Sequence, residues 1–266
     1  MAAQRARVGV GEEPEGGPLI PNLVSLIEQN SQDPVPITFL PLPEGVAGAY
    51  IRREGRPFIF VSSSTWPVRR RFTIAHEYGH HVLGHAPKID TVDDLRDWTT
   101  QIEVEANAFA AEFLAPANAV RRWMAVQAAE TGGPGTLETL VRLAHHFGIS
   151  AESARYRVED AGVVTDRPTL KWLDGAIKAA EHKPVQKKLG LAEHLGSPGR
   201  DDVAEVELGA RRQPSVVTKQ VLTIAGNGLL QPERISELIE VPLDALENLF
   251  KERGIAVPPE DDDLGL

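Results

Sequence analysis

Apolar side chains recur every three or four positions in several stretches of the chain, as they do along one face of a helix. This spacing predicts helices over residues 19–29 and 102–114, and Pro116 ends the second of them. A further helix is predicted between Pro67, which is typical of a first helical turn, and Gly84, which is typical of a helix end.

Three short runs have the composition of strands. Residues 37–40, 47–52 and 57–61 are rich in β-branched, aromatic and small apolar side chains. The last two runs flank Glu54 and Gly55, a turn signal that predicts a β-hairpin. An exposed edge of the strand over residues 57–61 is a candidate surface for binding an extended peptide by main-chain pairing.

The rest of the chain divides into segments of different composition. The acidic stretch over residues 86–97 predicts a loop, and Gly148 followed by Ser150 predicts the turn and the N-cap of a helix-turn-helix pair. The expected order is a disordered leader (1–18), a first domain (19–130), a helical region with helix-turn-helix spacing (136–195), a polar linker (196–213), a C-terminal helical segment (214–257) and an acidic tail (258–266).

Composition excludes several classes of site and partner. The 266 residues include no cysteine, so any metal ligand must be His, Asp, Glu or water. The net charge of −10 argues against a broad nucleic-acid surface, because phosphate binding needs a local excess of Lys and Arg. Since the chain has neither a signal peptide nor an apolar run of about 18 residues, the expected location is the cytoplasm.

One predicted helix contains the motif His-Glu-x-x-His. His76 and His80 lie four residues apart, so both imidazoles face one side of the helix and can bind one ion. Glu77 is offset by one position, which places its carboxylate beside such an ion as a candidate general base. The simpler alternative is a helix surface that happens to be rich in histidine, since His81 and His85 are nearby.

A catalytic zinc site normally has three protein ligands, so a third one is needed. Glu103 borders the apolar stripe of the next helix, whereas Glu105 points about 200° away from it. His85 stands one residue out of register with the third histidine of a large zincin class. We therefore predict Glu103 as the ligand, with Asn107 one turn further on to hydrogen-bond a ligating imidazole and fix its tautomer.

Two imidazoles and one carboxylate would leave a zinc ion positively charged, with one coordination position free. Water there becomes acidic, and Glu77 accepts its proton during attack on a carbonyl that the ion polarises. With a peptide as substrate this reaction is amide hydrolysis, and Glu77 then protonates the leaving amine. Zn2+ is the expected metal, and Mn2+ or iron could occupy the same ligands.

Three stretches resemble the ImmA/IrrE family of bacterial and phage metallopeptidases: GVAG (45–48), RFTIAHEYGH (71–80) and EVEANAFAAEFLAP (103–116). The resemblance covers roughly residues 19–165. It implies an α+β fold, namely a mostly helical, zincin-like domain with a small antiparallel sheet, followed by helical segments of helix-turn-helix type.

The same resemblance implies roles for individual residues. His76, His80 and Glu103 would be the metal ligands, and Glu77 would be the base. The implied substrate is a helix-turn-helix (XRE-type) transcriptional repressor, whose cleavage derepresses mobile-element or stress-response genes. Tyr78 stands where such motifs usually carry Leu. This departure does not affect the proposed ligands or the base.

Two other functions stay open at this point. In one, the metal only holds the domain together while the helical segments bind a repressor or DNA; Glu77 argues against it, because a structural site needs no base. In the other, the helix after Ser150 reads DNA through Arg155 and Arg157, but Glu152 and other acidic residues offset their charge. We expect a protein substrate, and neither DNA nor a membrane as partner.

Overall fold

The computed structural model describes residues 2–9, 20–30, 32–96, 99–127, 130–191, 203, 206–226, 231–239 and 241–253. Its sheet has the order β1-β3-β2-β4 and consists of β1 (Ile37–Leu40), β2 (Val46–Arg53), β3 (Arg56–Ser62) and β4 (Lys88–Thr91). β2 pairs antiparallel with β3 and β4, whereas β1 is parallel to β3. The fold is α+β as expected, but the sheet is mixed rather than antiparallel, because β3 inserts between β1 and β2.

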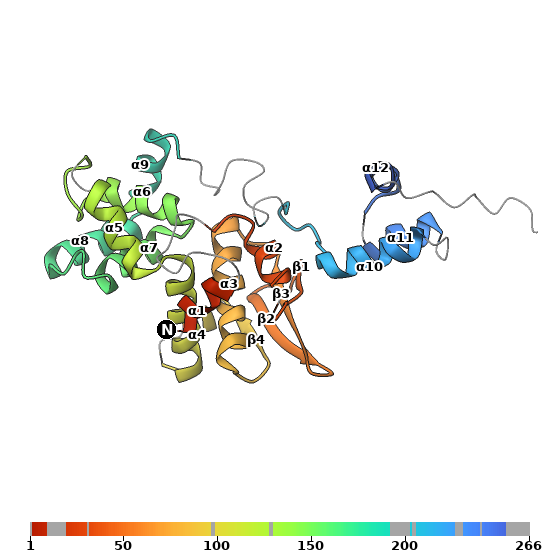
Figure 1. Ribbon diagram of the computed structural model, residues 1–266. Coiled ribbons are helices and arrows are strands. Elements are labelled where there is room, and N and C mark those ends of the chain that lie inside the picture. Colours follow the sequence, from red (N-terminus) through yellow and green to blue (C-terminus); the bar gives the residue numbers. More distant parts are fainter. Residues whose placement is uncertain are drawn as a thin grey trace, which may run out of the picture.

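Helices surround this sheet (Figure 1). They are α1 (Ala2–Gly9), α2 (Leu23–Glu28), α3 (Pro67–Leu83), α4 (Gln101–Leu114), α5 (Ala117–Gln127), α6 (Leu137–Phe147), α7 (Ala151–Asp160), α8 (Arg167–Lys178), α9 (His182–Lys188), α10 (Ser215–Gly226), α11 (Pro232–Ile239) and α12 (Leu243–Arg253), with a short 3-10 helix, η1 (Asp94–Arg96). Among the described residues, no helix combines the length and the apolar character that crossing a bilayer requires.

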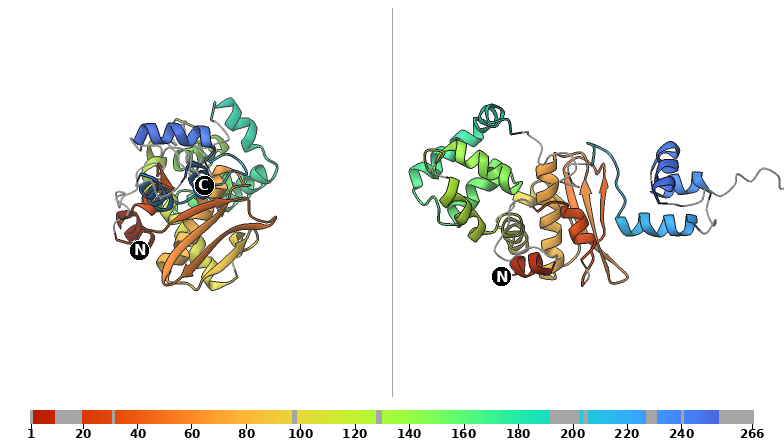
Figure 2. Two further views of the ribbon diagram at one scale, coloured as in Figure 1. Left: turned by 90° about the vertical axis from the view of Figure 1, so that its right-hand side faces the viewer. Right: turned by 45° about the horizontal axis from the view of Figure 1, so that its top comes forward.

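The layers place α3 at the centre of the molecule. α3 packs against β2 and β3 on one face of the sheet, and α4 packs against α3. The helices α5 to α9 lie beyond α4, whereas α10 to α12 lie on the other side of the sheet (Figures 1 and 2). α3 therefore lies between the sheet and α4. Its buried polar side chains need hydrogen-bond partners inside the protein.

The helix-turn-helix pair forms as the sequence predicts, but its arginines face inward. Ser150 caps α7 by accepting a hydrogen bond from the Ser153 N–H. Arg155 and Arg157 are 7% and 5% exposed. Arg155 pairs with acidic side chains of α7 and α8, and Arg157 Nη2 lies 2.6 Å from the carboxylate of Glu112 on α4. These two guanidinium groups hold helices together, so neither is available to contact a phosphate.

The hydrophobic cores do not follow the domain boundaries that the composition of the sequence predicts. One core runs from α1 through the sheet and on to α8, so it continues across the expected boundary near residues 130–136. A second, smaller core is made by α10, α11 and α12. The C-terminal helical segment thus has a core of its own, whereas the helix-turn-helix pair shares the core of the first domain.

Two segments that were expected to lack structure are packed. Residues 2–9 of the expected disordered leader form α1, and Ala3 is buried, while residues 10–19 lie outside the described part. In the expected linker, Val203 is fully buried, and Arg212 pairs with the backbone of Phe39 on β1. The described residues of both segments thus differ from the expectation, because a polar composition does not prevent single apolar side chains and backbone groups from packing against distant partners.

The buried guanidinium of Arg70 explains how the polar segment is held. Arg70 on α3 donates to the carbonyls of Thr65 and Ser63, and also to those of Val203 and Val206 far along the chain. A guanidinium offers five donors, so one side chain can satisfy several backbone carbonyls at once. The segment that leads to α10 is therefore fastened to the start of α3.

Candidate metal centre

α3 carries both motif histidines, and its ends are set locally. Pro67 occupies the first turn, where its missing N–H costs nothing, and Gly84 ends the helix in the left-handed conformation, with a φ of 75°. His76 and His80 are fully buried, and their Nε2 atoms lie 3.0 Å apart. Two imidazole nitrogens at this separation on one helical face can share one ion.

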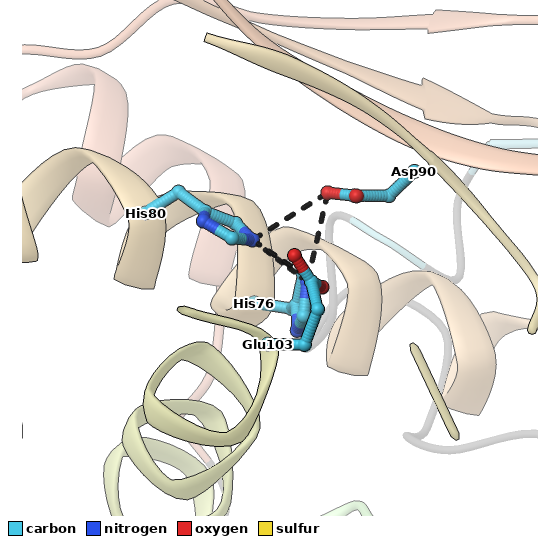
Figure 3. A group of neighbouring side chains, drawn as sticks. All are labelled: His76, His80, Asp90 and Glu103. Carbon is cyan, nitrogen blue, oxygen red and sulfur yellow. Dashed lines mark hydrogen bonds and ion pairs between the residues drawn. The ribbon is translucent and has the colours of Figure 1, made fainter. Parts of the chain in front are cut away.

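α4 brings Glu103 to the same point (Figure 3). Its Oε2 lies 3.2 Å from His76 Nε2 and 3.8 Å from His80 Nε2, and the side chain is fully buried. Glu105 is 44% exposed and contacts His85 instead, with 3.2 Å between the carboxylate and Nε2. The structure thus brings His76, His80 and Glu103 together and leaves Glu105 outside.

A fourth side chain, which the sequence analysis did not single out, joins this group. Asp90 Oδ2 lies 3.6 Å from His76 Nε2 and 3.5 Å from His80 Nε2. One donor atom from each of the four residues lies within 4.8 Å of the other three. Asp90 belongs to β4, so the expectation of a loop over residues 86–97 is wrong at residues 88–91.

The exposure of apolar and polar side chains on β4 is the reverse of what the sequence suggests, so Asp90 could not be predicted from the sequence. Ile89 is 64% exposed, whereas Asp90 is fully buried. Hydrophobic alternation would have placed these two side chains the other way round. The pairing of β2 with β4 shifts register between Val46 and Gly48, next to Asp90, and such irregularities re-aim side chains. Only the paired sheet reveals this residue.

Polar neighbours fix the orientation of both imidazoles. His76 Nδ1 lies 3.0 Å from Asn107 Oδ1, and His80 Nδ1 lies 2.8 Å from His85 Nδ1. His85 in turn contacts Glu105 through its other nitrogen. A partner on Nδ1 leaves Nε2 free to face the centre, which is how ligating histidines are usually held. His85 therefore lies behind His80 and not in the group of four.

The carboxyl group of Glu77 is buried against β2, at Gly48. A Cβ on Gly48 would lie 2.6 Å from Glu77 Oε1, so only glycine leaves room for this carboxyl. Among the described residues, neither oxygen of Glu77 makes a hydrogen bond of normal geometry. Burial raises the pKa of Glu77 well above its ordinary value, and the nearby Asp90 carboxylate raises it further.

The charges of the centre are unevenly distributed. Burial alone would lower the pKa of His76, but the Asp90 and Glu103 carboxylates outweigh it and raise this pKa. Burial, together with the neighbouring His76, lowers the pKa of His80 to about 4. Burial would raise the pKa of Asp90, but hydrogen bonds from His76 and Lys88 lower it to about 2. The centre thus holds two ionised carboxylates and a neutral imidazole, a combination that attracts cations.

The four donor atoms fit a divalent cation in both geometry and charge. Metal–ligand bonds of about 2.0–2.1 Å give a tetrahedron with edges of about 3.3–3.4 Å. The five donor–donor separations that involve a histidine run from 3.0 to 3.8 Å, and all four donor atoms lie within 4.8 Å of one another. Two carboxylates would balance the charge of a divalent ion, and two imidazoles add neutral donors. Imidazole and carboxylate are ligands that zinc accepts.

A comparison with known families agrees with this site. Residues 32–159 match the Peptidase_M78 family model, described as the IrrE N-terminal-like domain. The match runs from β1 to α7 and includes all four donor residues and Glu77. No curated protein matches the chain. The match confirms the ImmA/IrrE resemblance and supports a metallopeptidase kind of function. Residues 32–159 of this chain therefore match an IrrE N-terminal-like domain.

Proposed function

We propose that this protein is a metal-dependent endopeptidase in which His76, His80 and Glu103 hold a zinc ion and Glu77 is the general base. The observation that carries the proposal is the meeting of two imidazoles and a carboxylate in one buried group, beside the buried carboxyl of Glu77, which accepts no hydrogen bond of normal geometry among the described residues. A structural metal site has no use for that carboxyl, whereas hydrolysis requires a base at this position.

The ion would polarise the scissile carbonyl and acidify the attacking water. Glu77 must be ionised to take the proton of that water and then give it to the leaving amine. Positive charge nearby favours the ionised form, so metal loading offsets the effect of burial on its pKa. Asn107 and His85 keep the imidazoles oriented during this exchange.

The sheet has an edge strand near the candidate metal centre, but it is not the strand that the sequence predicts as a peptide-binding edge. β3, over residues 56–62, lies between β1 and β2, so it has no free edge. β4 is the edge strand nearest the centre, and it pairs with β2 alone among the described strands. We infer that an extended substrate segment pairs with β4, where main-chain hydrogen bonds would align it beside the metal ligands.

The proposed substrate is a helix-turn-helix (XRE-type) repressor, as the ImmA/IrrE resemblance implies. Cleavage of a repressor would derepress its genes, which makes the protein a transcription regulator that acts in the cytoplasm. The test is incubation of the zinc-loaded full chain with the purified repressor encoded beside it, followed by mass analysis of fragments. Discrete fragments that are absent with Glu77→Gln support the proposal, whereas an intact repressor with both proteins refutes it.

A second function, a non-proteolytic regulator that binds a repressor around a structural metal, is favoured by the fourth side chain. A shell filled by protein ligands is typical of structural zinc, because no position is left for water. Asp90 would fill that position. The two functions differ in the repressor experiment, since a structural site gives stable binding without fragments and is indifferent to Glu77→Gln.

A further inference from the structure

Asp90 stands where the attacking water would have to be. Its Oδ2 is at similar distances from His76 Nε2 and His80 Nε2, 3.6 and 3.5 Å. Together with the three expected ligands it forms a group of four donor atoms that all lie within 4.8 Å of one another (Figure 3). In a catalytic zinc site the fourth corner belongs to water. The carboxylate of Asp90 therefore takes the corner on which hydrolysis depends.

The same carboxylate lies next to the proposed base. Asp90 pairs in register with Gly48, and the carboxyl of Glu77 is packed against Gly48. A base can take a proton only from a water within hydrogen-bond reach. Asp90 lies within reach of both His Nε2 atoms and Glu77, where such a water would have to be bound. The side chains of all five residues of this centre are fully buried, which agrees with a closed site.

We propose that Asp90 is a fourth metal ligand and that its carboxylate keeps the centre latent until β4 moves. This inference rests on the proposed function, because latency has meaning only for a peptidase. The ligand set would then have two states. Four protein ligands hold the ion without water, and departure of Asp90 leaves the three ligands and the base as an open site.

β4 has the properties of an element that can move. It is four residues long, at the edge of the sheet, and pairs with β2 across a register shift. Its Ile89 is largely exposed, so little apolar packing holds the strand down. Pairing of a substrate or partner segment with the free edge of β4 could supply the free energy that draws Asp90 from the ion.

Lys88 stabilises the closed arrangement, in which the Asp90 carboxylate faces the two histidines. Its Nζ lies 2.9 Å from Asp90 Oδ1, 2.8 Å from Glu103 Oε1 and 3.0 Å from Asp94 Oδ1. One ammonium group thus ties β4 to α4 and to η1. Asp93 is exposed and lies outside the group of four donors, so it provides a control for the loss of one carboxylate near β4.

The test uses cobalt as a spectroscopic probe in the full chain. Cobalt(II) is loaded into the wild type, Asp90→Ala and Asp93→Ala, and visible absorption and cobalt affinity are measured with and without formate. The wild type should show the intense bands of four-coordinate cobalt, insensitive to formate. Asp90→Ala should show weaker bands of a water-bearing ion and at least about a tenfold loss of affinity, since even indirect partners of a ligand are worth that much.

Formate should restore the wild-type spectrum of Asp90→Ala, because alanine plus formate replaces the missing carboxylate. Asp93→Ala should behave as the wild type. An Asp90→Ala spectrum identical to the wild type, or one that formate does not change, overturns the inference. If Asp90→Ala does not fold, Asp90→Asn decides by cobalt affinity, and an unchanged affinity overturns the inference. No readout here depends on peptidase activity, so a failure of the proposed function would be seen separately, as an intact repressor.

Discussion

The buried centre between α3, α4 and β4 differs from the helix-turn-helix pair α6–α7 in how its polar groups are satisfied. Both regions bury charged side chains. In α7, Arg155 and Arg157 each meet acidic partners, and Arg157 also donates to the Ala115 carbonyl. In the centre, Glu77 has no hydrogen bond of normal geometry among the described residues, and the donor atoms of two histidines face each other.

This difference distinguishes buried charges that stabilise the fold from buried charges that are suited to binding a metal ion. Burying an unpaired polar group costs free energy, so a fold retains it only where something compensates. The arginines of α7 are compensated within the protein and hold α4, α7 and α8 together. In the centre, Lys88 pairs with Asp90 and Glu103, but the facing Nε2 atoms of the two histidines would be compensated best by a cation between them. The helix-turn-helix pair is therefore assigned to structure, although its sequence spacing resembles that of a DNA reader.

The largest effect should come from Glu77→Gln. This change keeps the size of the side chain but removes the base, so repressor cleavage should fall by about 100- to 10,000-fold. Metal affinity and thermal stability should not fall, because the neutral amide replaces a carboxyl whose charged form burial disfavours. Cleavage rate, zinc content and melting temperature are measured, with Glu105→Gln on the exposed side of α4 as the control. Unimpaired cleavage would contradict the role of Glu77.

A smaller but still large effect is expected from Gly48→Ala. The added Cβ would meet Glu77 Oε1 and Thr73 Cγ2, both at 2.6 Å, so the base must shift. A misplacement of about 1 Å costs up to about 100-fold in rate. The matched control is Gly175→Ala on α8, where a Cβ meets nothing within 4 Å. Equal cleavage rates for the two variants would show that the packing of Glu77 against β2 is irrelevant.

In the helix-turn-helix pair, Arg157→Ala should affect stability and not metal binding. It removes the donors to Glu112 and to the Ala115 carbonyl, 2.6 and 2.8 Å away, so the buried Ala115 carbonyl loses this hydrogen bond and α4 loses its ion pair with α7. A loss of about 2–3 kcal/mol in the free energy of unfolding is expected. Urea denaturation measures this loss, and zinc affinity serves as the second readout. A large fall in zinc affinity without a loss of stability would reverse the assignment of the two regions.

The smallest effect should come from the cap of α7. Ser150→Ala removes the acceptor for the Ser153 N–H and should cost about 1 kcal/mol. Ser150→Asp should retain most of the stability, since aspartate is also a good cap. Thermal denaturation of the three proteins gives the order. A cap that proves worthless would mean that α7 is held by its arginine pairs alone.

The candidate ligands on helices could be predicted because helical spacing is local. His76 and His80 follow from a four-residue repeat, and Glu103 follows from the apolar stripe of its own helix. These three candidate residues could therefore be identified without knowledge of the tertiary structure. The hairpin around Gly55 and the cap at Ser150 were predictable for the same reason, since each depends on a few neighbouring residues.

What could not be predicted depends on contacts between distant segments. Asp90 is buried, and Ile89 exposed, by the pairing of β4 with an irregular part of β2. The parallel pairing of β1 has no signal in its own four residues. The segment around Val203 reads as a linker because its partner, Arg70 on α3, lies 133 positions away. Polar composition says nothing about such a partner.

The central claim is that one divalent ion is bound jointly by α3 and α4. The most direct measurement is the zinc content of the purified full chain by mass spectrometry under native conditions, for the wild type, His80→Ala, Glu103→Ala and Glu105→Ala. The account predicts one zinc ion per chain in the wild type and in Glu105→Ala, and loss of zinc in the other two variants. A wild type that binds no divalent metal, or zinc that is retained without Glu103, would contradict it.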